Sequence, residues 1–406
     1  MAELSTATSQ CDAEVAVVGG GPAGLLCAIA LKVAGVDTLL IAPAAEPDHR
    51  TTALLAGSVT ALETLGVWDA CRPHAAPLSV IRIVDDTARL IRAPEVLFTA
   101  AEIGLDAFGS NIENRHLLAA LEARVDALAI PRIRAPALAV TVNDQAVTFA
   151  HAKGMVRAQL AVGADGARSL CRAAAGIGSK RRSYPQAALT LNLDHARPHD
   201  GTSTEFHTES GPFTLVPLPG RRSSLVCVLR PDDAQALAAQ TDTALSREVE
   251  RRAHSLLGAM QVEPGRGFFP LAVETPESIA RGRIALIGEA AHVVPPIGAQ
   301  GLNLGLRDAA AIAEIAAEAR RDNRDPGEPA VLARYAAERR VDVASRAMAV
   351  DLLNRSLLTD FIPAQGFRGL SLYLVNRIGP LRRALMRDGV APTLARAPRL
   401  MRGERL

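Results

Sequence analysis

Aromatic side chains are scarce in this sequence. They make up 3% of its 406 residues, with a single tryptophan. Proteins that bind single-stranded nucleic acid usually stack the bases on aromatic rings, so that class is disfavoured. The net charge of +2 also argues against a general polyanion-binding role. We therefore expect no nucleic-acid partner.

Cysteines and long apolar runs are also few. The five cysteines include no CxxC pair, which predicts reduced thiols and no metal site. The longest uncharged run, Val15–Leu31, contains four glycines and a proline, so we do not expect it to span a membrane. The first fourteen residues are acidic and polar, unlike a signal peptide. We expect a cytoplasmic protein.

Apolar residues, in contrast, are abundant. They make up 49% of the chain against 22% charged residues, a balance typical of globular proteins, and the length predicts two or three lobes. The chain opens with a strand–helix–strand pattern over Glu14–Val18, Gly24–Val33 and Val36–Ile41. Periodicity then predicts helices over residues 51–70 and 114–128 and a strand over residues 155–162.

Residues 184–275 change character. Alternating stretches at Phe213–Pro217 and Ser224–Leu229 are typical of strands, and turns are expected at Pro219-Gly220 and Pro231-Asp232. This pattern predicts a mostly antiparallel sheet over the first domain, to which the chain returns at Arg283. The first domain is therefore expected to be discontinuous.

The first motif is a GxGxxG directly after the first strand. It consists of Gly19, Gly21 and Gly24, with Pro22 and Ala23 before the last glycine. The first glycine permits a tight turn, the second lets the backbone approach a pyrophosphate, and the third lets helix and strand pack closely. The pyrophosphate then lies at the helix N-terminus. The strand and helix context favours dinucleotide binding over a simple glycine-rich turn.

The acidic residue that usually ends the second strand is missing. Such a residue holds the adenosine ribose, but here the strand ends in Ile41-Ala42-Pro43. Either Glu46 or Asp48 reaches back, or the ribose lacks that contact. Losing one such hydrogen bond weakens binding by about 1.5–3 kcal/mol without abolishing it.

Two shorter motifs offer groups for phosphate. Arg50, in the stretch Asp48–Leu54, has fork-shaped donors; the alternative is a surface arginine beside a helix cap. Asp165 can accept hydrogen bonds from loop amides, and Gly166 supplies a free φ. The alternative there is an ordinary Asp-Gly turn capped by Ser169. The placement of both motifs among the others favours ligand binding.

The most informative segment is Arg283–Asp308. A strand leads into a loop rich in glycine and proline, and a helix opens near Gly301. Backbone N–H groups at a helix N-terminus lack partners and carry roughly half a positive charge, so they can hold a flat anionic ring closely. His292 in this loop is interpreted as a structural histidine that bonds the loop, because a base must reach the substrate proton.

These motifs resemble those of the FAD-dependent aromatic hydroxylases of the para-hydroxybenzoate hydroxylase family, and most of all its ubiquinone-biosynthesis branch. The resemblance implies that NAD(P)H docks briefly and reduces bound FAD. It implies that O₂ adds at the flavin C4a carbon and that the hydroperoxide hydroxylates a polyprenylated phenol. The implied cofactor contacts are Gly19, Gly21, Pro22, Ala23, Gly24, Arg50, Asp165, Gly166, Glu289, Pro296, Gly298, Gln300, Gly301, Leu302 and Asn303.

Two of these positions have specific implied roles. Glu289 stands where the family has an aspartate on a flavin ribityl hydroxyl. Pro296 is expected at the substrate edge of the flavin and is the best candidate for a catalytic position. No protein base is named, because the ring carbon is activated by its own hydroxyl group. Residues 298–303 would present amides to the pyrimidine side of the ring.

The resemblance also implies the fold class. It is α/β, with a Rossmann-like FAD/NAD(P)-binding domain of the para-hydroxybenzoate hydroxylase type, an inserted, mostly antiparallel β-sheet substrate domain and C-terminal helices. The expected FAD-binding domain comprises residues 1–75, 111–183 and 276–350. The expected substrate domain comprises residues 76–110 and 184–275, and residues 351–406 form a C-terminal helical segment.

Further expectations concern the inserted sheet. Phe213, Leu215 and Pro217 are predicted to form an apolar roof that keeps water off the flavin. Cys227 stands where the ubiquinone branch tends to carry tryptophan. There is no second GxGxxG for the nicotinamide nucleotide. Residues 180–182, Lys-Arg-Arg, could steer its phosphates, although a solvated loop is favoured.

The C-terminal end is basic. From Arg377 to Leu406, eight arginines stand against Asp388 and Glu404, a local net charge of +6. Apolar residues recur at helical spacing over residues 366–388, with a break expected at Gly379-Pro380. Such a stripe more often docks on its own protein. The alternative is peripheral contact with the inner face of a membrane, beside other ubiquinone-biosynthesis proteins.

Two other functions remain open. The substrate could be a small soluble phenol, or the chain could be a flavoprotein without catalysis that serves as a partner in a biosynthetic complex. Ala42 and Glu289 are the departures from the family pattern that keep the second alternative open.

Overall fold

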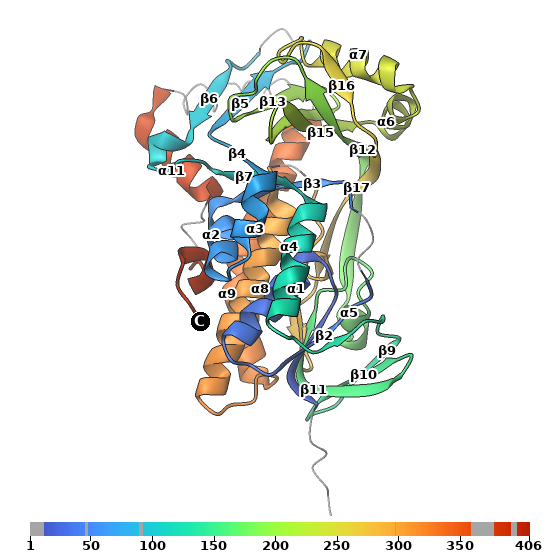
Figure 1. Ribbon diagram of the computed structural model, residues 1–406, viewed down its shortest axis with the longest axis vertical. Coiled ribbons are helices and arrows are strands. Elements are labelled where there is room, and N and C mark those ends of the chain that lie inside the picture. Colours follow the sequence, from blue (N-terminus) through green and yellow to red (C-terminus); the bar gives the residue numbers. More distant parts are fainter. Residues whose placement is uncertain (1–11, 45–47, 89–91, 297, 359–376, 391–395) are drawn as a thin grey trace, which may run out of the picture.

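The computed structural model describes residues 12–44, 48–88, 92–296, 298–358, 377–390 and 396–406. Two large sheets dominate the molecule. The first lies in its lower half in Figure 1, beside long helices, and the second lies across the top.

The first sheet is mostly parallel. Its strands are β1 (Ala13–Val18), β2 (Thr38–Ile41), β8 (Arg132–Ile133), β9 (Ala139–Val142), β10 (Val147–His151), β11 (Gly154–Gly163), β18 (Ala280–Arg281) and β19 (Ile284–Leu286). They lie in the order β18-β19-β11-β1-β2-β8, with β10 and β9 added to β11. Pairing is parallel from β19 to β8. The central strands are almost wholly apolar, as expected for parallel strands covered on both faces.

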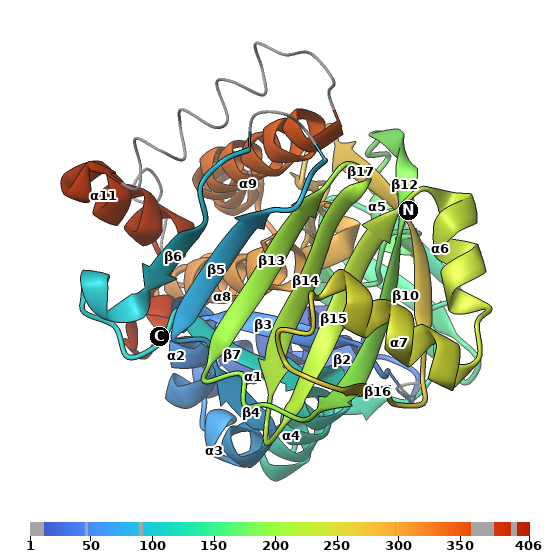
Figure 2. The ribbon, with the colours of Figure 1, turned by 90° about the horizontal axis from the view of Figure 1, so that it is seen from above.

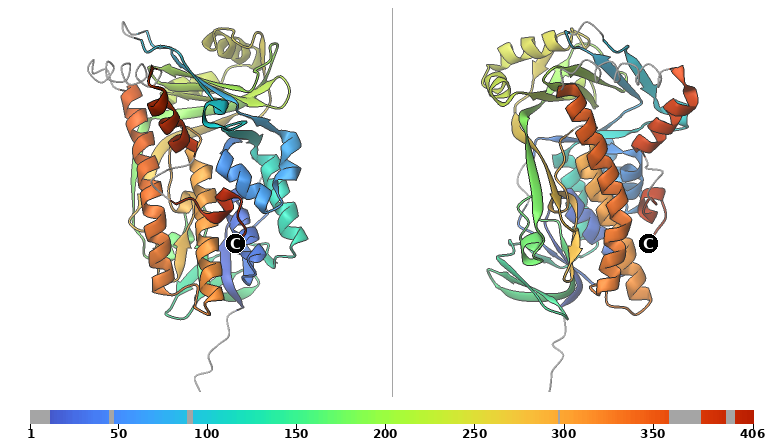
Figure 3. Two further views of the ribbon diagram at one scale, coloured as in Figure 1. Left: turned by 90° about the vertical axis from the view of Figure 1, so that its left-hand side faces the viewer. Right: turned by 180° about the vertical axis from the view of Figure 1, so that it is seen from behind.

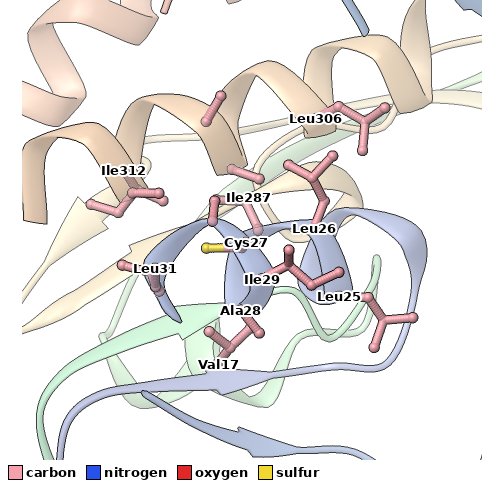
Figure 4. Close-up of a cluster of buried hydrophobic side chains, with 14 of the residues drawn as sticks. Val17, Leu25, Leu26, Cys27, Ala28, Ile29, Leu31, Ile287, Leu306 and Ile312 are labelled. Atoms are coloured by element: carbon pink, nitrogen blue, oxygen red, sulfur yellow. The ribbon is translucent and has the colours of Figure 1, made fainter. Parts of the chain in front are cut away.

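Helices cover this sheet. They include α1 (Pro22–Val33), α4 (Asn114–Ala127), α8 (Gln300–Arg321) and α9 (Pro329–Leu358). Every residue of α1 from Gly24 to Leu31 is buried, because the helix lies between the sheet and α8. Figure 4 shows this layer, with Val17 of β1 on one side of α1 and Leu306 of α8 on the other. Helix α9 packs beside α8 along the back of the molecule (Figure 3).

The second sheet is mostly antiparallel. Its strands are β5 (Val80–Asp85), β6 (Val96–Thr99), β12 (Ser179–His195), β13 (Thr202–Thr208), β14 (Gly211–Leu218), β15 (Arg222–Leu229), β16 (Met260–Val262) and β17 (Gly267–Pro276). The order is β16-β12-β15-β14-β13-β5-β6, and β17 also pairs with β12. Helices α6 (Pro231–Ala238) and α7 (Asp242–Arg252) cover its outer face, as Figure 2 shows from above.

A small third sheet lies between the other two. It consists of β3 (Thr51–Leu55), β7 (Gly109–Glu113) and β4 (Ala75–Pro77), in the order β3-β7-β4. The remaining helices are α2 (Ala56–Thr64), α3 (Trp68–Cys71), α5 (Leu170–Ala174) and α11 (Gly379–Val390). The 3-10 turns are η1 (Arg72–His74), η2 (Ala100–Ile103), η3 (Gly288–Ala290) and η4 (Arg399–Arg402).

Most predicted elements are confirmed to within two residues at each end. These are the opening strand–helix–strand unit, helix α4 and strands β11, β14 and β15. The break expected at Gly379-Pro380 matches the start of α11. The apolar pattern before it, over residues 366–376, lies outside the described residues.

Two local predictions are wrong. Residues 51–55 do not begin a helix, because they pair with β7 along their whole length, and Thr51 and Thr52 are β-branched residues that suit a strand. Pro231-Asp232 does not form a turn between strands but opens α6. Proline is well tolerated in the first turn of a helix, and an aspartate there complements the helix dipole.

The expected domain division remains a proposal with one adjusted limit. The limit at residue 350 falls inside α9, whose helical backbone continues to Leu358, so we place it at the end of that helix. The limit at residue 183 coincides with a shift in register between β12 and β17, which lies between Ser183 and Ala187.

Candidate active site

Three glycines shape the turn between β1 and α1. Gly19 has φ of 124°, and a Cβ added to it would lie 2.1 Å from the Ala164 carbonyl oxygen. A Cβ on Gly24 would lie 2.2 Å from the Gly19 carbonyl oxygen, whereas one on Gly21 would meet no atom within 4 Å. Gly19 and Gly24 therefore allow backbone segments to touch. Gly21 leaves open space that a ligand can approach.

The N-terminus of α1 opens at this space without a capping side chain. Gly21 is the N-cap residue, Pro22 stands in the first turn, and no acidic residue follows there. The first N–H groups of the helix are thus left for an external acceptor. The helix dipole favours a negative acceptor, so a diphosphate fits this position.

The position after β2 holds no acidic residue. Ala42 is buried there, and Glu46 lies outside the described residues. Asp48, the other candidate, accepts hydrogen bonds from Arg50 and Asn114. Its carboxylate is committed to these neighbours, so it does not reach back toward the end of β2.

Asp48 and Arg50 form a fork-shaped ion pair. Arg50 donates through Nε at 2.9 Å and through Nη2 at 2.7 Å. Burial opposes ionisation, but the hydrogen bonds from Arg50 and Asn114 lower the pKa of Asp48 to about 2. The hydrogen bond to Asp48 raises the pKa of Arg50, and the nearby charge of Glu289 acts in the same direction. Arg50 also lies 5.5 Å from the centre of the Phe269 ring and keeps its side chain half exposed.

Asp165 fixes the turn after β11. Its Oδ1 accepts from the Ser169 hydroxyl at 2.5 Å, and its Oδ2 accepts from the Cys171 amide at 3.0 Å. Ser169 in turn caps α5. The rigid loop and the capped Asp-Gly turn considered from the sequence are therefore both present. Gly166, with φ of 78° and open space at its missing Cβ, is the part of this turn left for a ligand.

The loop after β19 joins the two helices of the site. A Cβ added to Gly288 would lie 3.5 Å from the Ala23 Cβ, and a Cβ added to Gly305 would lie 3.0 Å from the Gly288 Cα. Ala23 belongs to the first turn of α1 and Gly305 to the second turn of α8. The N-terminal ends of α1 and α8 therefore meet at Gly288.

Helix α8 also begins without a capping side chain. Its N-cap residue, Ala299, has φ of 54°, and Gly298 before it has φ of 63°. A positive φ is uncommon outside glycine, and such strained positions cluster at functional sites. Gln300 donates its side-chain amide to the Gly298 carbonyl at 3.0 Å. The first backbone N–H groups of α8, which include those of Gly301 and Leu302, are left for an electron-rich acceptor.

The side chain of Asn303 is occupied by the protein. Its Oδ1 accepts from the Leu55 amide at 2.8 Å and the Ser58 hydroxyl at 2.7 Å, and its Nδ2 donates to the Ala53 and Ala299 carbonyls. Asn303 thus fastens β3 and α2 to the start of α8. Only its backbone remains for a ligand.

Glu289 and Pro296 mark the two ends of the loop. Both are exposed, and Glu289 makes no hydrogen bond to a residue that the structure describes. Its carboxylate is therefore available to a ligand hydroxyl. Ile297 lies outside the described residues.

Beneath the loop lies a buried ionic network that the sequence reasoning missed. His292 Nε2 lies 2.6 Å from Asp308 Oδ2, Arg339 donates to Asp308 Oδ1 at 2.7 Å, and Gly288 donates its N–H to the same carboxylate. Burial opposes ionisation, but the charges of His292 and Arg339 lower the pKa of Asp308 to about 2. The sequence signal was the pair of charged residues Arg307 and Asp308 in the otherwise uncharged first half of α8. His292 points into this network, which agrees with its structural interpretation.

The predicted apolar roof lies on the wrong face of the second sheet. Phe213 and Leu215 pack in one cluster with Leu237 of α6 and Leu245 of α7, on the face away from the first sheet (Figure 2). Cys227 belongs to the same cluster. Successive strand residues alternate between faces, so the sequence pattern identified the strand but not which set of side chains faces the site.

The inner face carries a different set of residues. Val226 and Val228 of β15 pack with Ala188 and Leu271. Ser224, on the same face of β15, accepts a hydrogen bond from Asn111 of β7 at 3.1 Å. The inner face of β15 is thus turned toward the small sheet and the first domain.

The basic triplet at residues 180–182 is not in a loop. It lies on β12, paired with β17. Arg181 lies 3.3 Å from Glu274, which also accepts from Arg172 at 2.9 Å. Within this triplet, Arg181 therefore forms an ion pair inside the protein.

Two other features are absent from the part of the chain that the structure describes: a cluster of metal-ligating side chains and a membrane-spanning helix. No group of three or more His, Cys, Asp or Glu side chains is arranged to hold a metal ion there. Likewise, none of the helices described is both long and apolar enough to cross a membrane.

Comparisons with known proteins agree with this geometry. The family described as "FAD binding domain" matches residues 12–350. Ubiquinone hydroxylase UbiL of Rhodospirillum rubrum is 36% identical over 403 residues, which cover 96% of this chain and 93% of that protein. The 3-demethoxyubiquinol 3-hydroxylase of Escherichia coli is 31% identical and covers 92% of this chain and 97% of its own.

The chain belongs to the ubiquinone-biosynthesis branch of the FAD-dependent monooxygenases. It is an FAD-dependent aromatic hydroxylase. A crystal structure of p-nitrophenol 4-monooxygenase PnpA from Pseudomonas putida has the same fold, with a TM-score of 0.76 and 21% identity over 93% of this chain and 98% of that one. The predicted fold class and FAD cofactor are therefore confirmed.

The residues of this hydroxylase fit FAD. Two uncapped helix N-termini meet at Gly288, Gly21 and Gly166 leave open space, and Glu289 offers a free carboxylate. The structure brings together the β1–α1 turn and the 288–303 loop directly. It ties the Asp165 turn to them through Arg172, which donates to the Ala290 carbonyl at 3.1 Å.

Proposed function

We propose that this hydroxylase acts on the aromatic ring of a polyprenylated phenol, with NAD(P)H as transient electron donor and O₂ as oxidant. We place it at the cytoplasmic face of the membrane as a peripheral protein, beside other proteins of ubiquinone biosynthesis. The relatives support the substrate class, since one is named a ubiquinone hydroxylase and the other a 3-demethoxyubiquinol 3-hydroxylase.

One observation carries the proposal. The uncapped N-termini of α1 and α8 meet at Gly288, so one elongated ligand can place a diphosphate on the first helix and an electron-rich ring on the second. FAD has this shape, and when bound it supplies the two-electron chemistry that links NAD(P)H to O₂.

Each part of the proposed FAD site has its own task. The turn of Gly19, Gly21, Pro22, Ala23 and Gly24 would hold the diphosphate. Arg50 and Gly166 would serve the same polar part of the ligand, and Glu289 would accept a hydrogen bond from a ribityl hydroxyl.

The start of α8 has a separate task. The backbone amides of Gly298, Gln300, Gly301, Leu302 and Asn303 would stabilise negative charge on the ring system, because the helix dipole and the backbone at its start are fixed in place beforehand. Pro296, at the exposed end of the loop, would stand at the edge where the substrate approaches.

We propose that the protein mainly excludes water from the reacting groups and that it does not supply a base. Val226 and Val228 on the inner face of the second sheet, packed with Leu271, offer the apolar cover. We assign no protein base, because His292 is buried against Asp308 and the phenol activates its own ring carbon.

The direct test is turnover by the purified holoprotein. With NAD(P)H, O₂ and a short-chain prenylated phenol, we expect a product that mass spectrometry finds one oxygen atom heavier. The matched control is the same phenol without the prenyl group. Equal turnover of the control would favour a small soluble phenol as the substrate. NAD(P)H oxidation that yields only peroxide with both compounds would contradict the proposal.

The ring position needs a second experiment. Deleting the coding gene in its host should cause one quinone precursor to accumulate, and the oxygen missing from that precursor names the carbon that is hydroxylated. Normal quinone levels in the deletion strain would contradict a role in this pathway.

A further inference from the structure

Helix α11 is fastened to the rim of the second sheet by two side chains. Arg382 donates to the Glu102 carboxylate through Nε at 2.6 Å and Nη2 at 2.8 Å, and its guanidinium lies 4.6 Å from the centre of the Phe98 ring. Met386, one turn later, packs in a buried cluster with Phe108. Since residues four apart share a helix face, Arg382 and Met386 define the face that docks on the protein.

The two leucines of α11 do not lie on that docked face. Leu381 and Leu385 are 41% and 50% exposed, and Ile378, just before the helix, is 43% exposed. Leu97 on the edge strand β6 is 44% exposed, and its carbonyl accepts a hydrogen bond from Arg382. We call Leu97, Ile378, Leu381 and Leu385 the rim patch.

The rim patch is unusual for this molecule. The described part of the chain exposes ten large apolar side chains, of which four belong to the rim patch. Single exposed apolar residues are normal, but a group of them marks an interaction surface. The docked face of α11 is already filled, so packing on the protein's own body does not account for these side chains.

Arginines accompany the rim patch. Arg383 and Arg387 on α11 are exposed, while the nearby acid Glu102 is paired with Arg382. Residues 377–390 contain four arginines and one aspartate, a local charge of +3. Exposed leucines flanked by arginines complement a surface with anionic headgroups above an apolar layer.

We propose that the rim patch and its arginines are the surface with which this protein docks on an anionic lipid bilayer. This proposal rests on the proposed function in one respect, since it identifies the face through which a membrane-held substrate would be met. Helix α11 lies at the outer edge of the molecule beside β6 (Figures 1 and 2), where a flat surface can approach it. The exposed leucines would enter the headgroup layer, and Arg383 and Arg387 would reach lipid phosphates.

The test is sedimentation of the full FAD-loaded protein with lipid vesicles. Wild-type protein should pellet with vesicles that contain phosphatidylglycerol and much less with pure phosphatidylcholine. The L381E/L385E variant should bind the anionic vesicles at least about tenfold more weakly, because the apolar contact is lost. The R383Q/R387Q variant should lose a similar factor, because each arginine near an anionic surface contributes several-fold.

A matched control uses exposed apolar residues elsewhere. Leu138, just before β9, and Met155, on β11, are 62% and 75% exposed. Strands β9 to β11 lie at the opposite end of the molecule from α11 (Figure 1). The L138E/M155E variant should bind as wild type does. L97E leaves α11 unchanged and should also weaken binding. This variant shows that the loss does not come from unfolding of the helix.

Several results would overturn the proposal. These are wild-type protein that stays in solution with both kinds of vesicle, rim variants that bind like wild type, or an equal loss in the control. A change from dimer to monomer in L381E/L385E without vesicles would make the patch a subunit interface instead. Turnover of a short-chain soluble phenol, measured on the same samples, keeps the questions separate: intact turnover without vesicle binding rejects the docking surface and leaves the proposed function standing.

Discussion

The two large sheets of this hydroxylase differ in how the residues that stabilise the fold are related to the residues that shape the site. Around the first sheet, the atoms that hold the fold also shape the site: Gly24 packs helix on turn, and Asp308 supports the loop that ends in the exposed amides of α8. In the second sheet the two tasks lie on opposite faces. Phe213 and Leu215 stabilise the outer layer, while Val226 and Val228 line the inner one. Variants around the first sheet should therefore change stability and the properties of the site together. Variants in the second sheet should change one without the other.

The largest effect is expected for Asp308→Ala. Arg339 pairs with both Asp308 and Asp342, and Asp342 also pairs with Arg307. The change removes one carboxylate from this buried network and the acceptor for the Gly288 amide, so the free energy of unfolding should fall by about 3–5 kcal/mol. FAD affinity should fall with it, because the loop loses its support. Chemical denaturation and flavin-fluorescence titration measure the two quantities. A variant that loses stability but binds FAD normally would break the predicted coupling.

Phe213→Ala tests the separation in the second sheet. Removing a buried aromatic ring should lower the free energy of unfolding by about 3 kcal/mol and leave the yield of hydroxylated product per NAD(P)H unchanged. Val226→Ala is the matched change on the inner face. It should affect stability less and increase the peroxide released. If Phe213→Ala raised peroxide release and Val226→Ala did not, the assignment of the faces would be reversed.

The variants Gly24→Ala and Gly21→Ala compare a residue that packs the fold with one that borders open space, both within the turn between β1 and α1. A methyl group on Gly24 would strike the Gly19 carbonyl, whereas one on Gly21 would enter open space. We expect the first change to lower the free energy of unfolding of the FAD-free protein by about 1–3 kcal/mol and the second to leave it nearly unchanged. Thermal unfolding without FAD measures both. Equal losses would mean that Gly21 also serves the fold.

The smallest effect concerns Asp48. Because its pKa in the folded protein is lowered from 3.8 to about 2, its ionised form stabilises the fold above about pH 4, and this contribution disappears as the pH falls toward 2. Since Arg50 is half exposed, Asp48→Asn should lower the free energy of unfolding by only about 1 kcal/mol at neutral pH. The difference from wild type should shrink between pH 4 and pH 2. A difference that grows on acidification would have the wrong sign.

The sequence was sufficient where backbone geometry decides the outcome. Each glycine at positions 19, 21 and 24 was predicted to have a definite use between the strand and the helix. The structure shows close backbone contacts at Gly19 and Gly24 and open space at Gly21. The helix that opens near Gly301 was predicted for the same reason. These signals are local, so no knowledge of the tertiary fold was needed.

The sequence was insufficient where a partner distant in the chain decides. Residues 51–55 look helical until β7 pairs with them. The sequence also does not show that Leu55 and Ser58 occupy the side chain of Asn303 and leave only its backbone for a ligand. The prediction of the apolar roof was wrong because the alternation of side chains along a strand identifies two faces of the sheet. It does not say which of these faces α6 and α7 cover. Asp308 and Arg339 pair across 31 residues, a contact that spacing alone does not reveal.

The most direct test of the central claim is a titration of the FAD-free protein with FAD, for wild type and for Gly21→Val. We predict that wild type takes up one FAD per chain and that NAD(P)H bleaches the yellow complex under argon. The bulkier side chain should weaken FAD binding by at least about tenfold, because it fills the space at the N-terminus of α1. Failure of wild type to take up FAD, or equally tight binding by Gly21→Val, would contradict a cofactor held between the two helix N-termini.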